Sequence, residues 1–482
     1  MHTRATGGIA ALLAATALLT ACSSTSGEPP PPAPEAPADL SAGLSEPVAD
    51  PLYPAYGNPA VDVLHYGLSF RYDPDGAVLH GRAALTIRPV RDATELRLDL
   101  AAGLTVTEAT VGGQVVTATH DGHDLAVPAT VHKDQNILLT VTYHGVPAPV
   151  AAPAERPDMA AGVGMNVDSD GSLWTMQEPY GAFTWYPVND HPSDEALYDF
   201  SVTTPEGWTA VATGEHMGTE VADGEQTSVW HSPEPVASYV TTLAVGRFTL
   251  HDQGVFGDGV RVMSWLPENA PPEWVDAVAR IPDMLSWLEA RYGPYPFGQA
   301  GVVVVGGRSG METQGTVTIS AGLASLGGPR TQRVLLHELA HQWFGDAVSP
   351  RDWRDVWLNE SMATYAEAMW AVDEGLLTEA EAVAVWRDAD QELRGDYGPP
   401  GAYDPAAFAA RNVYFCTALM LHELRGELGA ETFERMLREW VQEQPNTTQD
   451  RASFTAWVNR YGDEDLTGFV DAWLDSPTTP AT

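Results

Sequence analysis

The residues of this chain with the clearest chemical potential lie in the pentapeptide HELAH, residues 337–341. On a helix, residues four apart lie on the same face, so His337 and His341 can both reach one metal ion. Glu338 lies one step round the helix and can contact a ligand of that metal without being a ligand itself. This pattern is typical of zinc hydrolases in which the glutamate is the general base. The structural alternative is an amphipathic helix with two incidental histidines.

A catalytic zinc takes three protein ligands and leaves one position for water, so a third ligand is needed. The segment RDVWLNESMATYAEAMWA, residues 354–371, has helical spacing and carries Glu360 near its start, nineteen positions after His341. A carboxylate at that place can instead be a solvated first-turn residue that the helix dipole favours. Together with the histidine pair, it predicts an open site of His337, His341 and Glu360 that holds one Zn²⁺ per chain.

The segment HELAHQWFGD, followed by WLNES, resembles the aminopeptidase N family of zinc metallopeptidases, which are gluzincins and include leukotriene A4 hydrolase. The resemblance extends from about residue 55 to the C-terminus. It implies a zinc-dependent aminopeptidase that removes N-terminal residues from peptides with a free N-terminus. In this family the ligands are two histidines and a glutamate at this spacing, and Glu338 is the expected general base.

The resemblance continues in the segment SGMET, residues 309–313, where the family carries Gly-Ala-Met-Glu-Asn on an edge strand beside the substrate. It implies that Glu312 binds the α-amine of the substrate and that Gly310 and Met311 lie against the substrate. A carboxylate near the zinc would attract an ammonium group. Thr313 departs from the family pattern, which leaves the side-chain preference open, and an exposed strand-end glutamate is the structural alternative.

A second amine-binding carboxylate is expected from the β-rich part of the chain. The segment WTMQEPYGAFTWYPVNDHPSD, residues 174–194, resembles the corresponding family segment, and Glu178 stands at the amine-binding position. Met176 replaces the usual glutamine. A packing role for this aromatic loop is the structural alternative.

An oxyanion donor is expected from a later helix. In RNVYFCTALMLHELRGELG, residues 411–429, Tyr414 stands where the family has a tyrosine whose hydroxyl stabilises the oxyanion. Cys416 and Thr417 depart from the family pattern here. A buried core tyrosine is the structural alternative, and Tyr403 is the other nearby hydroxyl donor.

The elements that must position these residues change in character along the chain. From about residue 53 to 250, apolar and polar residues alternate between Gly, Pro and Asp turns, which predicts strands. Residues 273–293 have helical spacing with a kink expected at Pro282, and helical patterns dominate after residue 331. We therefore expect an α+β multidomain protein. An N-terminal saddle-like β-sheet domain, residues 53–250, would precede a thermolysin-like catalytic domain, mixed α/β and then helical, at residues 251–482.

Composition excludes some partners. The chain has 482 residues, 44% of them hydrophobic, which suits two or more globular domains. Its net charge of −40 argues against nucleic acid as a partner, because phosphate binding needs clustered Lys and Arg. The preferred N-terminal residue, the oligomeric state and the physiological substrate cannot be predicted from these patterns.

The N-terminus has the pattern of an export signal. Residues 1–21 combine one arginine with an apolar stretch that is too short for a membrane span. LTAC, residues 19–22, resembles a bacterial lipobox, which implies cleavage before Cys22 and its lipidation. The proline-rich residues 22–52 would then tether a lipoprotein to a membrane outside the cytoplasm. An ordinary secretory signal is the alternative. Cys416 is the other cysteine, so no intramolecular disulfide is expected.

Two other functions share part of this pattern. A zinc epoxide hydrolase would share the metal site, but the chain ends soon after the catalytic helices, without a helical domain to complete a lipid-sized pocket. A surface peptide-binding lipoprotein with weak or no catalysis would have no need of Glu338. The sequence therefore favours an aminopeptidase.

Overall fold

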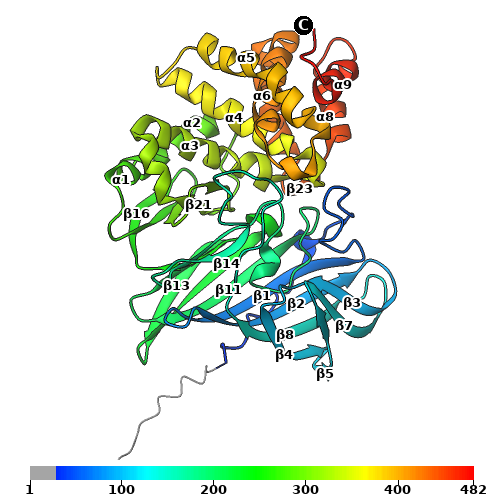
Figure 1. Ribbon diagram of the computed structural model, residues 1–482, viewed down its shortest axis with the longest axis vertical. Helices are drawn as coiled ribbons and strands as arrows, with labels where there is room; N and C mark the ends of the chain where they lie inside the picture. Colours follow the sequence, from blue (N-terminus) through cyan, green and yellow to red (C-terminus); the bar gives the residue numbers. More distant parts are fainter. Residues whose placement is uncertain (1–28, 482) are drawn as a thin grey trace, which may run out of the picture.

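The computed structural model describes residues 29–481, which form a sheet-rich N-terminal part and a largely helical C-terminal part (Figure 1). The strands of the first part lie at the bottom of Figure 1, and the helices of the second lie above them. The α+β prediction, with a sheet domain before a mixed and then helical domain, is confirmed.

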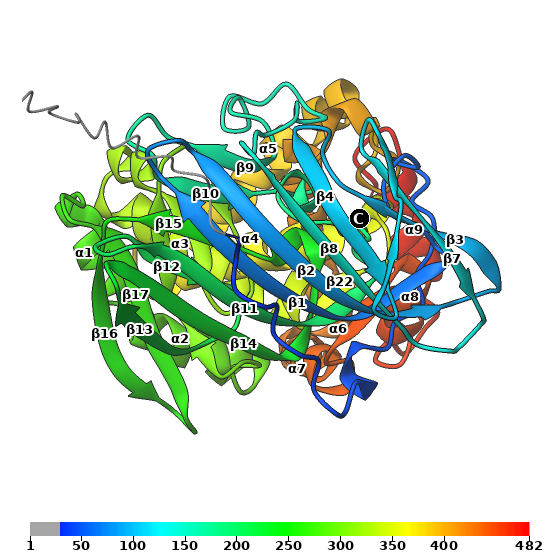
Figure 2. The same cartoon turned by 90° about the horizontal axis from the view of Figure 1, so that it is seen from below.

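An eight-stranded sheet is the base of the N-terminal part. In spatial order its strands are β13 (Glu215–Ala222), β14 (Glu225–Ala237), β11 (Glu195–Pro205), β1 (Val61–Asp73), β2 (Val78–Pro89), β8 (Ile137–Gly145), β4 (Leu104–Val111) and β5 (Gln114–Val116). Strands β1 and β11 are parallel, and the other neighbours are antiparallel. Figure 2 shows this sheet from below, with the helices behind it. Along β2, buried residues alternate with half-buried ones, as expected for a sheet with one covered face.

Two smaller sheets complete this part. One has the order β12 (Thr209–Ala212), β15 (Leu243–Gly246), β10 (Leu173–Met176) and β9 (Gly164–Val167), and the other has the order β3 (Ala93–Asp99), β7 (Asp124–Val131) and β6 (Thr119–Asp121). Strand β10 matters for the site, because Glu178 follows it by two residues.

A separate sheet begins at Phe248. In spatial order its strands are β16 (Phe248–Phe256), β17 (Val260–Pro267), β19 (Val302–Val305), β21 (Val317–Ser320) and β20 (Gly310–Met311), and β18 (Gln299–Ala300) pairs with β17. Strand β20 is antiparallel to β21 and forms one edge of the sheet. One side of β20 is therefore not paired with another strand among the described residues.

Helices form the rest of the C-terminal part. They are α1 (Pro272–Val278), α2 (Ile281–Tyr292), α3 (Gly328–Ala340), α4 (Trp357–Asp373), α5 (Glu379–Tyr397), α6 (Arg411–Leu428), α7 (Ala430–Glu443), α8 (Arg451–Val458) and α9 (Thr467–Asp475). The short strands β22 (Val348–Pro350) and β23 (Thr447–Gln449) pair with each other in parallel. The kinked helix predicted at residues 273–293 is two helices, because the ring of Pro282 fits only the first turn of a new helix.

The prediction that residues 22–52 form a tether is wrong for residues 29–52, the part of the segment that the structure describes. The Ser45 hydroxyl donates to the carbonyl of Glu195 at 3.0 Å, and the Trp353 amide donates to Asp50 Oδ2 at 2.8 Å. Side chains of the folded body also accept from amides of this proline-rich segment: the Ser45 amide donates to Asp62 Oδ1 at 3.2 Å, and the Val48 amide donates to Ser193 Oγ at 2.9 Å. Residues 29–52 therefore lie against both parts of the protein.

The predicted signal, residues 1–21, and Cys22 lie outside the described residues. Within residues 29–481, no helix combines the length and the apolar character that crossing a membrane requires.

Candidate active site

The end of helix α3 positions the two histidines. His341 is the last residue before the helix gives way to a wider turn at residues 342–346. Gly345 has φ +129°, and a Cβ there would lie 3.2 Å from the side chain of Asn359. The turn brings the Phe344 carbonyl to His341 Nδ1, which donates to it at 3.0 Å. The proton of His341 is therefore on Nδ1, and the lone pair of Nε2 faces the site.

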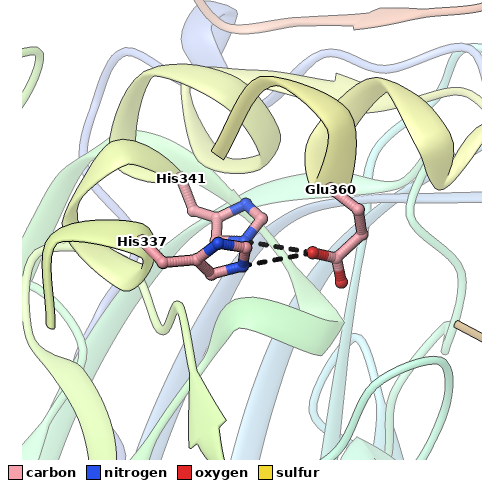
Figure 3. Close-up of side chains that lie close together, drawn as sticks. All are labelled: His337, His341 and Glu360. Atoms are coloured by element: carbon pink, nitrogen blue, oxygen red, sulfur yellow. Dashed lines mark hydrogen bonds and ion pairs between the residues drawn. The ribbon is translucent and has the colours of Figure 1, made fainter. Parts of the chain in front are cut away.

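Helix α4 supplies Glu360, the candidate third ligand, whose side chain lies beside the two histidines in Figure 3. Glu360 Oε2 lies 3.3 Å from His337 Nε2 and 3.5 Å from His341 Nε2, and the two Nε2 atoms are 3.1 Å apart. Donor atoms about 2.1 Å from a tetrahedral zinc ion would be separated by about 3.4 Å. Glu360 Oε2 is also buried without a hydrogen-bond partner. The predicted set of His337, His341 and Glu360 thus fits zinc in both spacing and chemistry.

The sequence did not predict Glu367, a carboxylate next to Nδ1 of His337. Glu367 Oε2 lies 3.6 Å from His337 Nδ1, and Arg333 pairs with the other oxygen of Glu367 at 2.8 Å. Glu367 lies two turns after Glu360 on α4, so the helical period was the signal that could have found it. Such carboxylates orient metal-binding histidines and raise their basicity.

Glu338 lies between the histidines and the edge strand. It is 6% exposed, and a Cβ added to Gly310 would come within 2.1 Å of Glu338 Oε1. A larger residue at Gly310 would therefore require the carboxylate to shift, because β20 passes close to it there. Burial raises the pKa of Glu338 to about 7, although the two nearby histidines oppose the rise. A carboxyl with this pKa can both accept and return a proton near neutral pH.

Two more carboxylates, one from each part of the protein, line the same cavity. Glu312 follows β20 and Glu178 follows β10, and each has a buried Oε1 without a hydrogen-bond partner. Burial raises the pKa of both groups, and the repulsion between them adds to the rise at Glu178. Met311 is 4% exposed beside them. A ligand with several N–H donors and a positive charge would satisfy this pair.

Tyr414 lies in the first turns of α6. Its ring stacks on that of His337, with centroids 6.1 Å apart and planes 23° apart. Burial raises its pKa well above the ordinary value, so the hydroxyl keeps its proton and can donate a hydrogen bond. The alternative donor, Tyr403, donates instead to the carbonyl of Trp353 at 2.6 Å. The structure thus brings Tyr414, and not Tyr403, to the histidines.

These residues surround one cavity of about 850 Å³. Its walls come from residues 154–163, 174 and 176–178 of the N-terminal part and from the segments 307–312, 334–341, 360–367 and 406–415. Every candidate residue that the sequence predicted within residues 29–481 lines it. The departure from the family pattern at Cys416 does not disturb the site, because Cys416 is fully buried and contacts the carbonyl of Asp390. The volume is in the range typical of small-ligand pockets.

Comparisons with known proteins agree with this geometry. Residues 277–473 match the Peptidase family M1 domain. Aminopeptidase N of Streptomyces lividans is 31% identical over 217 residues, which are 42% of this chain and 25% of that protein. Aminopeptidase N of Lactococcus lactis is 26% identical over 61% of this chain and 38% of that protein. The chain thus spans well under half the length of these two relatives.

Solved structures match over more of the chain. An M1 zinc metallopeptidase from Deinococcus radiodurans has a TM-score of 0.80 and 27% identity, and the match covers 90% of this chain and 97% of that one. Yeast LTA4 hydrolase, at 18% identity and a TM-score of 0.71, covers 88% of this chain and 69% of that one and shares the fold. With the motif match and the ligand geometry, these likenesses assign residues 277–473 to the Peptidase family M1 domain and show that the described part of the chain has the fold of M1 zinc metallopeptidases.

Proposed function

We propose that this protein is a zinc-dependent aminopeptidase that binds one zinc per chain and removes single residues from the free N-termini of peptides. The observation that carries the proposal is the buried pair Glu178 and Glu312, whose unpartnered oxygens lie in the same cavity as the three ligands. A carboxylate pair of this kind fits an α-ammonium group. Binding that group beside the metal ligands selects the first peptide bond of the substrate.

The catalytic work then divides among a few side chains. Zinc held by His337, His341 and Glu360 would supply a Lewis acid at the scissile carbonyl and make water more acidic. Glu338 takes the proton of the attacking water and returns it to the leaving amine. Tyr414 donates a hydrogen bond to the carbonyl oxygen as negative charge develops there.

The edge strand gives the substrate its direction. A peptide can add to the free side of β20 with its ammonium group between Glu312 and Glu178. Gly310 leaves room for Glu338 beside this strand, so the base lies next to the bound peptide. In support, the relative from Deinococcus radiodurans has been solved with a Tyr-Ser-Ala substrate bound.

Neither alternative explains the whole site. A peptide-binding protein without catalysis needs the carboxylate pair but not the buried Glu338 with its raised pKa. An epoxide hydrolase needs the metal ligands but not two unpartnered carboxylates at the end of the cavity. The aminopeptidase accounts for both features.

For location, we propose an exported lipoprotein anchored to the outer face of a membrane through Cys22. The support is the LTAC segment and the apolar stretch before it.

A panel of fluorogenic aminoacyl amides, assayed with and without a chelator, tests the function. We expect hydrolysis of several amides, its loss with the chelator and its return with added zinc. Glu338→Gln should keep the zinc and lose activity, because it removes the base but no ligand. Hydrolysis that a chelator leaves unchanged would contradict the proposal.

A further inference from the structure

One arginine from the N-terminal part lines the cavity and contacts the backbone just before the helix that carries Tyr414. Arg156 lies in the loop between β8 and β9, and its Nη2 and Nε bond to the carboxylate of Asp158 at 2.6 and 3.3 Å. Its Nη1 donates to the carbonyl of Ala409 in the C-terminal part. The guanidinium carbon lies 5.9 Å from the centre of the Tyr414 ring. A single side chain thus touches both the support of the helix and the tyrosine.

The contact with Ala409 falls at a strained point of the backbone. Ala409 has φ +47°, a left-handed conformation that a residue with a Cβ rarely adopts. It stands two residues before helix α6, whose N-cap residue, Ala410, has no side chain that could cap the helix. Backbone in such a conformation persists only when its surroundings hold it there. Arg156 supplies a charged hydrogen bond at this place, and Tyr414 follows within the first turns of the helix.

The charge of Arg156 also suits the reaction. The cavity wall carries several carboxylates, namely Glu178, Glu312, Glu338, Glu360 and Glu367. Their field disfavours new negative charge on a substrate oxygen near Tyr414. A guanidinium 5.9 Å from the centre of the tyrosine ring opposes that field, and its pairing with Asp158 reduces the effect.

We propose that Arg156 is a positioning residue for Tyr414. It holds the start of α6 through Ala409, and its charge favours the oxyanion that the Tyr414 hydroxyl stabilises. This inference rests on the proposed aminopeptidase function, in which Tyr414 is the oxyanion donor.

A double-mutant cycle tests whether Arg156 acts through Tyr414. Arg156→Gln should lower kcat for an aminoacyl amide about tenfold and change KM by less than about twofold. In the Tyr414→Phe background the same substitution should lower kcat by less than about threefold, since the positioning role is lost with the hydroxyl and only the direct effect of the charge on the oxyanion remains. Arg156→Lys keeps the positive charge but not the planar guanidinium group, so its kcat should lie between those of Arg156→Gln and the parent. An equal loss in both backgrounds, or a change confined to KM, would overturn the proposal.

A binding measurement gives a readout besides turnover. A phosphinic dipeptide analogue carries an anionic tetrahedral centre in place of the oxyanion, whereas a free amino acid tests only the amine end. Arg156→Gln should weaken the analogue about tenfold and leave the amino acid unchanged. Equal weakening of both ligands would show that the substitution disturbs the whole cavity and would overturn the proposal.

Two controls separate the possible failures. Arg247 makes a similar contact, with its guanidinium 4.9 Å from the ring of Trp208, outside the cavity, so Arg247→Gln should leave kcat unchanged. Zinc content should match the parent in every variant. If the parent hydrolyses no aminoacyl amide, the proposed function fails and this inference fails with it. If the parent is active and the cycle is additive, only the role of Arg156 is wrong.

Discussion

Replacing Glu312 by glutamine removes one of the two charges assigned to the substrate ammonium while keeping the shape of the side chain. Glu312 is 4% exposed and has an unpartnered Oε1, so the change acts inside the cavity. Glutamine can still accept a hydrogen bond, but it carries no charge. The variant therefore isolates the electrostatic part of amine recognition.

The size of the effect follows from two opposing interactions. A carboxylate and an ammonium about 4 Å apart attract by about 4 kcal/mol at an effective dielectric constant near 20. The repulsion that Glu178 now feels from Glu312 is relieved in the variant, which returns part of that energy. A net loss of about 2 to 3 kcal/mol corresponds to a decrease in kcat/KM of about 30- to 150-fold for substrates with a free amine.

The assay compares a free aminoacyl amide with its N-acetylated counterpart. The parent should hydrolyse the acetylated amide poorly, and Glu312→Gln should change that slow rate by less than about twofold, because no ammonium is present. Elemental analysis should find the same zinc content in both proteins, since Glu312 is not one of the three ligands. An equal loss on both substrates would refute amine recognition by Glu312.

Four further predictions concern other residues. Glu360→Ala should leave two ligands and largely abolish zinc retention, and equal zinc in variant and parent would count against the ligand set. Tyr414→Phe should lower kcat by about 100- to 1000-fold with little change in zinc content, whereas normal turnover would make the tyrosine structural. Burial and the nearby charge of Asp190 raise the pKa of Asp99 to about 8. The folded protein therefore holds a proton on Asp99 that the unfolded chain loses near pH 4, so the free energy of unfolding should fall as pH rises from about 4 to 8. Asp99→Asn should flatten this fall in melting temperature, and an unchanged slope would contradict the assignment. Cys22→Ser should release the protein from membranes or leave its precursor uncleaved, and an unmodified N-terminus elsewhere in the wild type would contradict the lipobox.

The parts of the site that the sequence predicts are those governed by local geometry. His337 and His341 lie on one helical face because they are about one helical turn apart. Glu360 is only nineteen residues after His341, so the next helix, α4, can place it beside the two histidines. The edge strand carrying Gly310 and Met311 was expected from the family resemblance, and the structure has it as β20.

What the sequence does not predict depends on long-range contacts. Arg156 and Ala409 are 253 positions apart, and no periodicity links them. Residues 29–52 were expected to be a tether because of their composition, but composition does not show which neighbours can satisfy a segment's few backbone groups.

The most direct test of the central claim is a time course of products from one synthetic peptide with a different residue at every position, followed by mass spectrometry with the zinc-loaded protein. The account predicts a ladder of products that each lack one more N-terminal residue, and no cleavage of the same peptide after N-acetylation. Internal fragments, or equal cleavage of the acetylated peptide, would contradict it.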